Sequence, residues 1–305
     1  MIEFDIDKIL VPVDFSPSSL NALETAVCIA RRHDASVLLV HVVETSGLAG
    51  GQPYDGGEAT TLMTHHAEQE LLVLQHSVIE RFQVNCEIVC CNGIVSSGII
   101  KVSVSHGADM IVMGTHGSSG FRESFIGLNA FNVVKGATCP VLTVPPTQKF
   151  DSFKKLLFPL RPIPGALDKY DLLRNFIRKE DAKLKILGLA TDYEKDGMYL
   201  KELTNRLYEK LILDQVESST YFKVGNNMAD EVLKISQLID ADMVVITTTM
   251  DPSHKQFFIG PYTQQIINRS RIPVLSVKPR VPQQDMEEVM EYTHQALHKK
   301  IPLYN

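Results

Sequence analysis

Residues 110–129 read MIVMGTHGSSGFRESFIGLN, and this stretch decides the fold. Its apolar start, which ends at Met113, predicts a buried strand. The segment Gly114-x2-Gly117-x9-Gly127 then leads toward a helix that we expect over 129–137. The first turn of a helix presents backbone N–H groups without acceptors and the positive end of the helix dipole. A glycine-rich loop between a strand and a helix therefore suits a phosphate group.

The rest of the first half alternates short apolar runs with helical patterns. We expect strands over 8–14, 36–43, 85–91, 110–113 and 140–144, with helices over 20–33, 59–82, 95–106 and 129–137. Continuous Val-, Ile- and Leu-rich strands separated by helices are typical of a parallel sheet covered on both faces. Ligands of such sheets bind beyond the carboxyl ends of the strands, where Asp14, Val42 and Gly114 converge on one cleft.

The pattern repeats after the linker at 145–152. Lys8-Ile-Leu-Val-Pro matches Lys155-Leu-Leu-Phe-Pro at an offset of 147, and Ala108-Asp-Met-Ile-Val matches Ala241-Asp-Met-Val-Val at 133. A constant offset over many residues indicates duplication, and a deletion after the second strand explains the change of offset. We therefore predict an α/β protein of two tandem doubly wound domains, 1–147 and 152–281, followed by a helical tail over 282–305. Each domain has a five-stranded parallel sheet with helices on both faces.

The last strand of each domain is expected at a sheet edge, which is a liability unless it is paired or covered. We expect Val141–Val144 and Val274–Val277 to pair, so that the two domains form an intrachain pseudo-dimer. The amphipathic pattern of the tail favours packing on this chain or on a second copy, which would give a homodimer.

Composition narrows the function. The 305 residues carry a net charge of −6, which does not suit binding to nucleic acid or to an acidic membrane surface. We see neither a signal-peptide pattern nor an apolar run of membrane-spanning length. The five cysteines form no CxxC pair, and reduced thiols are then the expectation. We therefore expect a cytoplasmic protein without nucleic-acid or membrane partners.

Four segments together resemble the universal stress protein family, here in tandem form. They are Ile9-Leu-Val-Pro-Val-Asp14, Leu39-Val-His-Val-Val43, Gly114-Thr-His-Gly117 with Gly127, and Cys139-Pro-Val-Leu-Thr-Val144. The resemblance extends over about residues 5–147 and 152–279. It implies a role in the stress response and a five-stranded α/β fold that often dimerises. In one subclass it also implies binding of ATP.

The resemblance also implies a site. In the ATP-binding subclass the Asp after the first strand contacts the ribose, the backbone at the end of the second strand contacts adenine, and the glycines hold the phosphates. Carried over and extended to neighbouring positions, the predicted site is Pro12, Val13, Asp14, Val42, Met113, Gly114, Gly117, Gly127, Leu128 and Asn129. The implied cofactor is ATP or another adenine nucleotide, accompanied by Mg²⁺.

The sequence departs from this pattern in both halves. The family has Ser or Thr after Gly127, where this chain has Leu128. Leucine cannot donate a hydrogen bond to a phosphate, and the loss of a hydrogen bond to a charged group costs about 1.5–3 kcal/mol. In the second half Arg161 takes the place of Asp14, and Thr247 that of Gly114. Met250 and Pro261 likewise replace Gly117 and Leu128. We therefore expect no nucleotide in the second half.

Each site residue also has a structural interpretation. Gly114 and Gly117 can serve a tight turn with positive φ, and Asp14 can cap the turn before Ser16. His41 fits a hydrogen-bonded core histidine. The cysteines and histidines match no zinc spacing, and we find no Walker lysine and no catalytic set.

Two functions remain open, whereas a third, a nucleotide-dependent enzyme on a related fold, is disfavoured because the loop has no acid/base or metal-ligand cluster. One is a stress-response module with a weakened adenine-nucleotide site in the N-terminal domain, which is at most a weak ATPase. The alternative is a stress protein that binds no nucleotide and acts through protein–protein contacts.

Overall fold

The computed structural model describes residues 5–44, 57–115, 126–146, 149–163, 165–251, 256–258 and 260–278. In the first half, helices and strands alternate as the sequence predicts. The elements are β1 (Lys8–Pro12), α1 (Pro17–His33), β2 (Ser36–Glu44), α2 (Gly57–Phe82), β3 (Cys86–Gly93), α3 (Val95–Ser105), β4 (Met110–Gly114), α4 (Leu128–Gly136) and β5 (Val141–Val144). The first strand is shorter than expected, because it ends at Pro12 rather than Asp14.

The second half repeats this order. Its elements are β6 (Lys155–Leu160), α5 (Asp168–Lys179), β7 (Lys183–Ala190), α6 (Tyr193–Leu213), β8 (Ser218–Val224), α7 (Met228–Leu238), β9 (Met243–Thr247), β10 (Thr249–Asp251), β11 (Gln256–Phe258), α8 (Pro261–Arg269) and β12 (Val274–Val277). Between β7 and α6 only Thr191 and Asp192 remain, whereas β2 and α2 are separated by 45–56. The shortening therefore falls after the second strand, as predicted. The antiparallel pair β10–β11, in contrast, was not expected.

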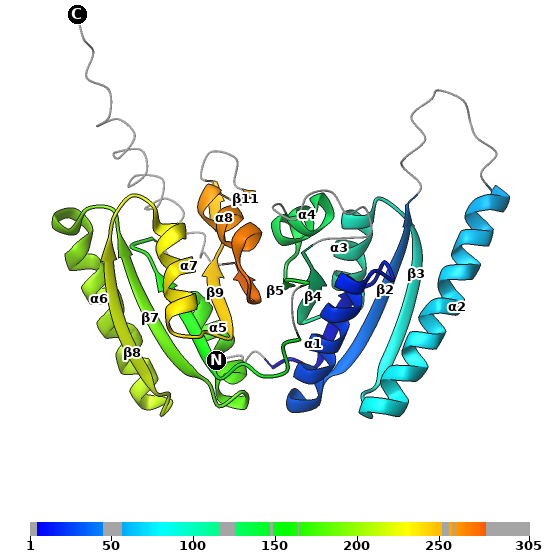
Figure 1. The fold of residues 1–305 in the computed structure, drawn as a ribbon, viewed down its shortest axis with the longest axis horizontal. Coiled ribbons are helices and arrows are strands. Elements are labelled where there is room, and N and C mark those ends of the chain that lie inside the picture. Colours follow the sequence, from blue (N-terminus) through cyan, green and yellow to red (C-terminus); the bar gives the residue numbers. More distant parts are fainter. Residues whose placement is uncertain are drawn as a thin grey trace, which may run out of the picture.

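The two five-stranded sheets join into one sheet of ten strands, in the order β3-β2-β1-β4-β5-β12-β9-β6-β7-β8. Neighbouring strands within each half are parallel, and β5 pairs with β12 in the antiparallel sense, with Leu142 opposite Leu275. The expected pairing of the two edge strands is therefore confirmed. In Figure 1 the outer helices α2 and α6 lie at opposite ends of the molecule.

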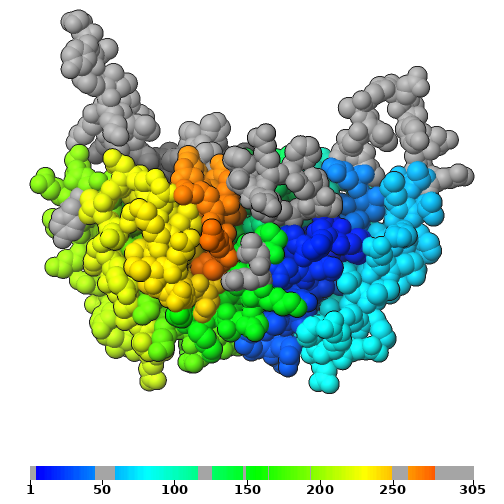
Figure 2. Space-filling view, viewed as in Figure 1, coloured from blue at the N-terminus to red at the C-terminus, as the bar shows by residue number. Residues whose placement is uncertain are grey.

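Helices cover both faces of the sheet, so consecutive strand residues enter two different cores. Ile9 and Val11 of β1 pack in a core beneath α1, α2, α5 and α6, whereas Leu10 packs in a core beneath α3, α4, α7 and α8. This alternation follows from the period of two along a strand. Both cores cross from one half to the other, and Figure 2 shows the halves in contact along their boundary.

An ion cluster around the buried Glu180 also joins the two halves. The fully buried carboxylate of Glu180 accepts hydrogen bonds from Arg32 Nε at 2.9 Å and contacts His33 Nε2 at 3.1 Å. The His33 ring also stacks on Phe176 of α5, with ring centroids 5.2 Å apart. These contacts connect the end of α1 to the end of α5. None of the helices in the described ranges combines the length and the hydropathy that crossing a membrane requires.

Candidate functional site

A cavity of about 390 Å³ opens at the carboxyl ends of β1, β2 and β4 in the first half. It therefore lies at the edge of the sheet where a ligand is expected in a doubly wound fold. Its walls come from the ends of these strands and from the N-terminal parts of α1, α3 and α4. The lining residues are Pro12, Val13, Asp14, Ser19, Val40, His41, Val42, Glu44, Val95, Ile99, Met113, Gly114, Asn129 and Ala130.

The cavity brings together most of the predicted site residues. These are Pro12, Val13, Asp14, Val42, Met113, Gly114 and Asn129. Gly127 is the residue before α4, and the side chain of Leu128 is 74% exposed, so neither residue lines the cavity. Gly117 lies outside the described residues, as does most of the glycine-rich loop at 116–125.

Asp14 holds the start of α1. Its Oδ1 accepts a hydrogen bond from Ser16 Oγ at 2.5 Å and another from the Ser16 backbone N–H at 3.1 Å. Ser16 is the N-cap of α1, and its Oγ in turn accepts from the Ser19 backbone N–H. Between them, Phe15 has a φ of 61°, which is uncommon for a bulky residue. Asp14 thus has the capping role that the sequence allowed, and it also forms part of the cavity wall.

Gly114 is explained by packing. A Cβ at this position would lie 2.4 Å from Ser18 Oγ and 3.0 Å from the Ser18 carbonyl oxygen. Gly114 does not have a positive φ, so the tight-turn interpretation is wrong for this residue. The absence of a side chain lets the end of β4 approach the first turn of α1, and this approach forms one side of the cavity.

The N-terminus of α4 closes the phosphate-binding end of the predicted site. The Gly127 N–H donates to the Thr115 carbonyl oxygen at 2.8 Å, which joins the two ends of the glycine-rich loop. The first turn of α4 begins at Leu128, and backbone N–H groups of a first turn have no acceptor within the helix. Asn129 of that turn lines the cavity, so the positive end of the α4 dipole lies at the cavity wall.

Half of the cavity wall was not predicted. The missed residues are Ser19, Val40, His41, Glu44, Val95, Ile99 and Ala130. His41 and Glu44 could have been predicted, because they lie near the carboxyl end of β2. Val95 and Ile99 could not, because tertiary packing decides which face of α3 lies against the sheet. His41 Nδ1 donates to the Val13 carbonyl oxygen at 2.7 Å, and the ring stacks on Phe15 with centroids 4.8 Å apart. His41 is therefore hydrogen-bonded, as expected, but it lies on the cavity wall.

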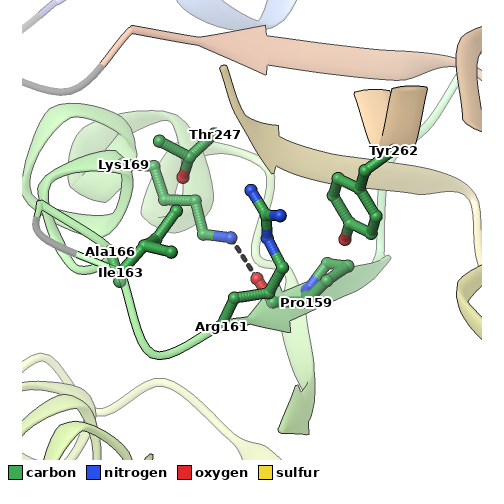
Figure 3. Close-up of a pocket in the computed structure, with 7 residues that line it drawn as sticks. All are labelled: Pro159, Arg161, Ile163, Ala166, Lys169, Thr247 and Tyr262. Carbon is green, nitrogen blue, oxygen red and sulfur yellow. Dashed lines mark hydrogen bonds between the residues drawn. The ribbon is translucent and has the colours of Figure 1, made fainter. Parts of the chain in front are cut away.

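The equivalent cleft of the second half is closed. Its space is about 10 Å³, lined by Pro159, Arg161, Ile163, Ala166, Lys169, Thr247 and Tyr262. These include the counterparts of Pro12, Asp14, Ser19, Gly114 and Asn129 at the repeat offsets. The Arg161 guanidinium lies over the Tyr262 ring, 4.2 Å from its centroid, and both side chains fill the cleft (Figure 3). A space of this size holds about one water molecule, whereas ligand pockets measure about 300–1,000 Å³.

The cysteines give no indication of a second site in the described part of the chain. Among the described residues, no group of three or more His, Cys, Asp or Glu side chains is placed to hold a metal ion. Cys90 and Cys91 pack against opposite faces of the sheet, as predicted for neighbours on a strand. Burial raises the pKa of both thiols, which disfavours the reactive thiolate form.

Comparison with known proteins identifies related chains. The model of the universal stress protein family matches residues 5–145 and 177–278. A universal stress protein of Methanocaldococcus jannaschii is 32% identical over 142 residues, which cover 47% of this chain and 84% of that protein. A Bacillus subtilis universal stress protein is 29% identical over 145 residues, covering 45% of this chain and 98% of its own length.

Solved structures show the same fold over both halves. A universal stress protein from Archaeoglobus fulgidus DSM 4304 superposes with a TM-score of 0.71 at 19% sequence identity. The match covers 89% of this chain and 98% of that one. At this identity the likeness establishes the architecture alone, including the arrangement of one half beside the other.

Proposed function

Since the chain belongs to the universal stress protein family, we propose that it is a stress-response module whose N-terminal half binds an adenine nucleotide. The ligand occupies the cavity at the ends of β1, β2 and β4. We divide the chain into an N-terminal domain at 1–147, which carries this site, and a C-terminal domain at 152–281, which binds no nucleotide. The proposed location is the cytoplasm, without nucleic-acid or membrane partners.

The contrast between the two clefts carries this proposal. The same fold provides about 390 Å³ in the first half and about 10 Å³ in the second. Only the larger space is of ligand size. The apolar residues Val40, Val42, Val95 and Ile99 line it and suit an adenine ring. Asp14 is in place to accept from a ribose hydroxyl, and the first turn of α4 suits phosphate oxygens, with Mg²⁺ as their counter-ion.

The groups that line the cavity favour binding over turnover. Its titratable side chains are Asp14, His41 and Glu44. Asp14 already holds Ser16, and His41 donates to the Val13 carbonyl oxygen, so both have structural partners. We therefore propose a binding module with at most weak ATPase activity. Further association of chains through 282–305 concerns residues outside the described part and stays a prediction.

Titration calorimetry of the full chain with ATP, ADP and AMP, each with Mg²⁺, tests the proposal. We expect one site per chain. Asn129→Tyr, which introduces the residue found at the equivalent position of the closed cleft, should abolish binding. Leu128→Ser should tighten ATP binding about tenfold, because it supplies a hydroxyl donor for the phosphates. Asn226→Tyr, the same change at an exposed position of the second half, is the matched control.

Two results would contradict the proposal. The first is no binding by the wild-type chain or by Leu128→Ser, which would favour the alternative of a stress protein that acts through protein–protein contacts. The second is an affinity that Asn129→Tyr leaves unchanged, which would place the ligand elsewhere.

A further inference from the structure

The strand β8 forms one outer edge of the ten-stranded sheet, at the end of the molecule away from the first half (Figure 1). Among the described residues it pairs with β7 alone, in a parallel register that runs from Leu184 opposite Ser218 to Ala190 opposite Val224. An edge strand presents a row of backbone N–H and C=O groups that can pair with a further strand. The outer side of β8 is therefore a place where another chain can be added to the sheet.

Two hydrogen bonds show which backbone groups of β8 point outward. The Leu184 N–H donates to the Glu217 carbonyl oxygen at 2.9 Å, and the Gly225 N–H donates to the Ala190 carbonyl oxygen at 3.0 Å. Glu217 and Gly225 thus face β7, and because the direction alternates along a strand, the odd-numbered residues between them face β7 as well. The even-numbered residues, which include Thr220, turn their N–H and C=O groups away from the sheet.

The side chains of β8 are exposed over most of its length. Residues 220–224 are all exposed, and Tyr221, Phe222 and Val224 among them are large and apolar. About half of Phe222 is accessible, at 49%, and Val224 is 54% exposed. Large apolar side chains on an open sheet edge mark an interaction surface.

The opposite outer edge, β3, is covered instead. Gln75 of α2 donates from Nε2 to the Cys86 carbonyl oxygen at 2.6 Å. The exposed residues of β3 are Glu87 and Asn92, which are both polar. The two outer edges therefore differ, and β8 is the open and apolar one.

We propose that β8 pairs with β8 of a second copy of this chain, in the antiparallel sense, around a two-fold axis at Thr220. In this register the outward N–H of each Thr220 donates to the carbonyl oxygen of the other, and Phe222 lies opposite Ser218 of the second copy. The contact is isologous, so one strand supplies both sides of it. The molecule already contains a pairing of this kind, because β5 and β12 are equivalent strands that pair in the antiparallel sense. The proposal does not depend on nucleotide binding.

Charge complementarity selects both the second copy and the register. Lys223 and Glu217 lie on the same face of the strand, and the two-fold axis at Thr220 places each of them opposite the other in the second copy. Cross-strand pairs of opposite charge are favourable, and the dimer contains this pair twice. A shift of the register by two residues in either direction places Lys223 opposite Ser219 or Gln215, so the charge pair is lost.

Light scattering on the full chain tests the pairing. We expect a mass of twice that of one chain. Thr220→Pro should give a monomer, because it removes an outward N–H and leaves the hydrogen bonds to β7 in place. Thr220→Val keeps the backbone donor and should stay dimeric, which makes it the matched control, and circular dichroism checks that both variants fold. A wild-type chain that stays monomeric at millimolar concentration would overturn the proposal, as would a folded Thr220→Pro variant that stays dimeric.

Charge reversal gives an independent measurement and decides the result if Thr220→Pro fails to fold. Lys223→Glu and Glu217→Lys each place like charges opposite one another twice in the dimer, and each should raise the Kd of dimerisation about tenfold. The double variant Lys223→Glu/Glu217→Lys should restore the wild-type Kd. Lys101→Glu, at an exposed position of the first half, is the control and should leave the Kd unchanged. A double variant that dimerises as weakly as the single variants would overturn the proposed pairing.

Discussion

Gly114 shows at the scale of one residue how the fold makes room for a ligand. Gly114→Ala would force a Cβ against both the side chain and the backbone of Ser18, and the backbone of α1 cannot move away alone. We expect a loss of about 1–3 kcal/mol in the free energy of unfolding, measured by urea denaturation. Ser18→Ala should rescue only part of that loss, because the Ser18 carbonyl oxygen remains.

Gly225→Ala is the control for this prediction. A Cβ at Gly225 would meet nothing within 4 Å, and its φ is ordinary. This variant should change the unfolding free energy by less than about 1 kcal/mol. Similar losses for Gly114→Ala and Gly225→Ala would show that the contact with Ser18 is not the reason for the glycine.

Two thiols with raised pKa values, the buried Cys86 and the half-buried Cys139, lead to a prediction about alkaline pH. Burial raises the pKa of Cys86 to about 12 and that of Cys139 to about 11, from an ordinary value of 9.0. Above pH 9 the unfolded chain loses these protons while the folded chain keeps them. The free energy of unfolding should therefore fall as pH rises from 9 to 11, by up to about 1.4 kcal/mol per pH unit for each thiol.

The variant Cys86→Ala/Cys139→Ala tests that cause. Its unfolding free energy at pH 7 serves as the reference, and its decline between pH 9 and 11, measured by urea denaturation, should be shallower than that of the wild type. Parallel declines of the two proteins would assign the alkaline loss to other groups, such as Tyr262.

Site residues could be predicted from the sequence only where topology alone places them. Asp14, Val42 and Gly114 lie near the carboxyl ends of β1, β2 and β4, so a parallel sheet brings them together whatever their side chains do. Val95 and Ile99 were missed because the orientation of α3 is decided by its packing on β2. The sequence likewise cannot distinguish a glycine that needs positive φ from one that a neighbouring helix approaches, and Gly114 proved to be of the second kind.

At the scale of elements, α1 and α5 are equivalent helices of the two halves, and they carry different charges where they are in contact. The offset of 147 that relates Lys8 to Lys155 also relates His33 to Glu180. A symmetric dimer of identical halves would place the same side chain on both sides of this contact. Here duplication has allowed the acid Glu180 on one side and Arg32 with His33 on the other, so the contact favours pairing of unlike halves.

Glu180→Gln should destabilise the contact between α1 and α5. The change leaves Arg32 without its buried carboxylate, and we expect a loss of about 3 kcal/mol, measured by urea denaturation followed by circular dichroism. Glu217→Gln is the control, since Glu217 pairs with Lys183 on the surface and should barely move the unfolding midpoint. Equal midpoints for the two variants would mean that the ion cluster contributes little.

At the scale of the whole molecule, β5 and β12 cover each other's edges. Thr143 Oγ1 also donates to the Val274 carbonyl oxygen at 3.1 Å, beside the backbone pairing. A fragment of residues 1–147 would lose this partner and expose the β5 edge. We expect the fragment to dimerise through β5 in light scattering, with the dimer disrupted by Thr143→Pro, which removes a backbone donor.

The full chain provides the comparison for that experiment. Because β12 already covers β5, Thr143→Pro in the full chain should lower stability without changing the mass in solution. A fragment that stays monomeric at high concentration would show that the β5 edge alone does not drive association.

The fold as a whole could be predicted further than the site. Apolar periodicity located the helices and strands of the first half, and the repeat offsets located the second half and its shortening. The pair β10–β11 was missed because the repeat offset of 133 aligns these residues with the glycine-rich sequence of the first half, for which no strand is expected. Lys169 was missed as well, since a lysine in a helical pattern normally reaches solvent and only the packed structure shows it buried.

The pairing of β5 with β12 also has a consequence during synthesis of the chain, because β5 is made well before its partner strand. The ribosome adds about 5–20 residues per second, so β5 leaves it on the order of ten seconds before β12 has been made. During that interval the first five strands can fold while their last edge is still open. Neighbouring nascent chains on one messenger RNA expose the same edge at the same time, and pairing between them competes with completion of the correct sheet.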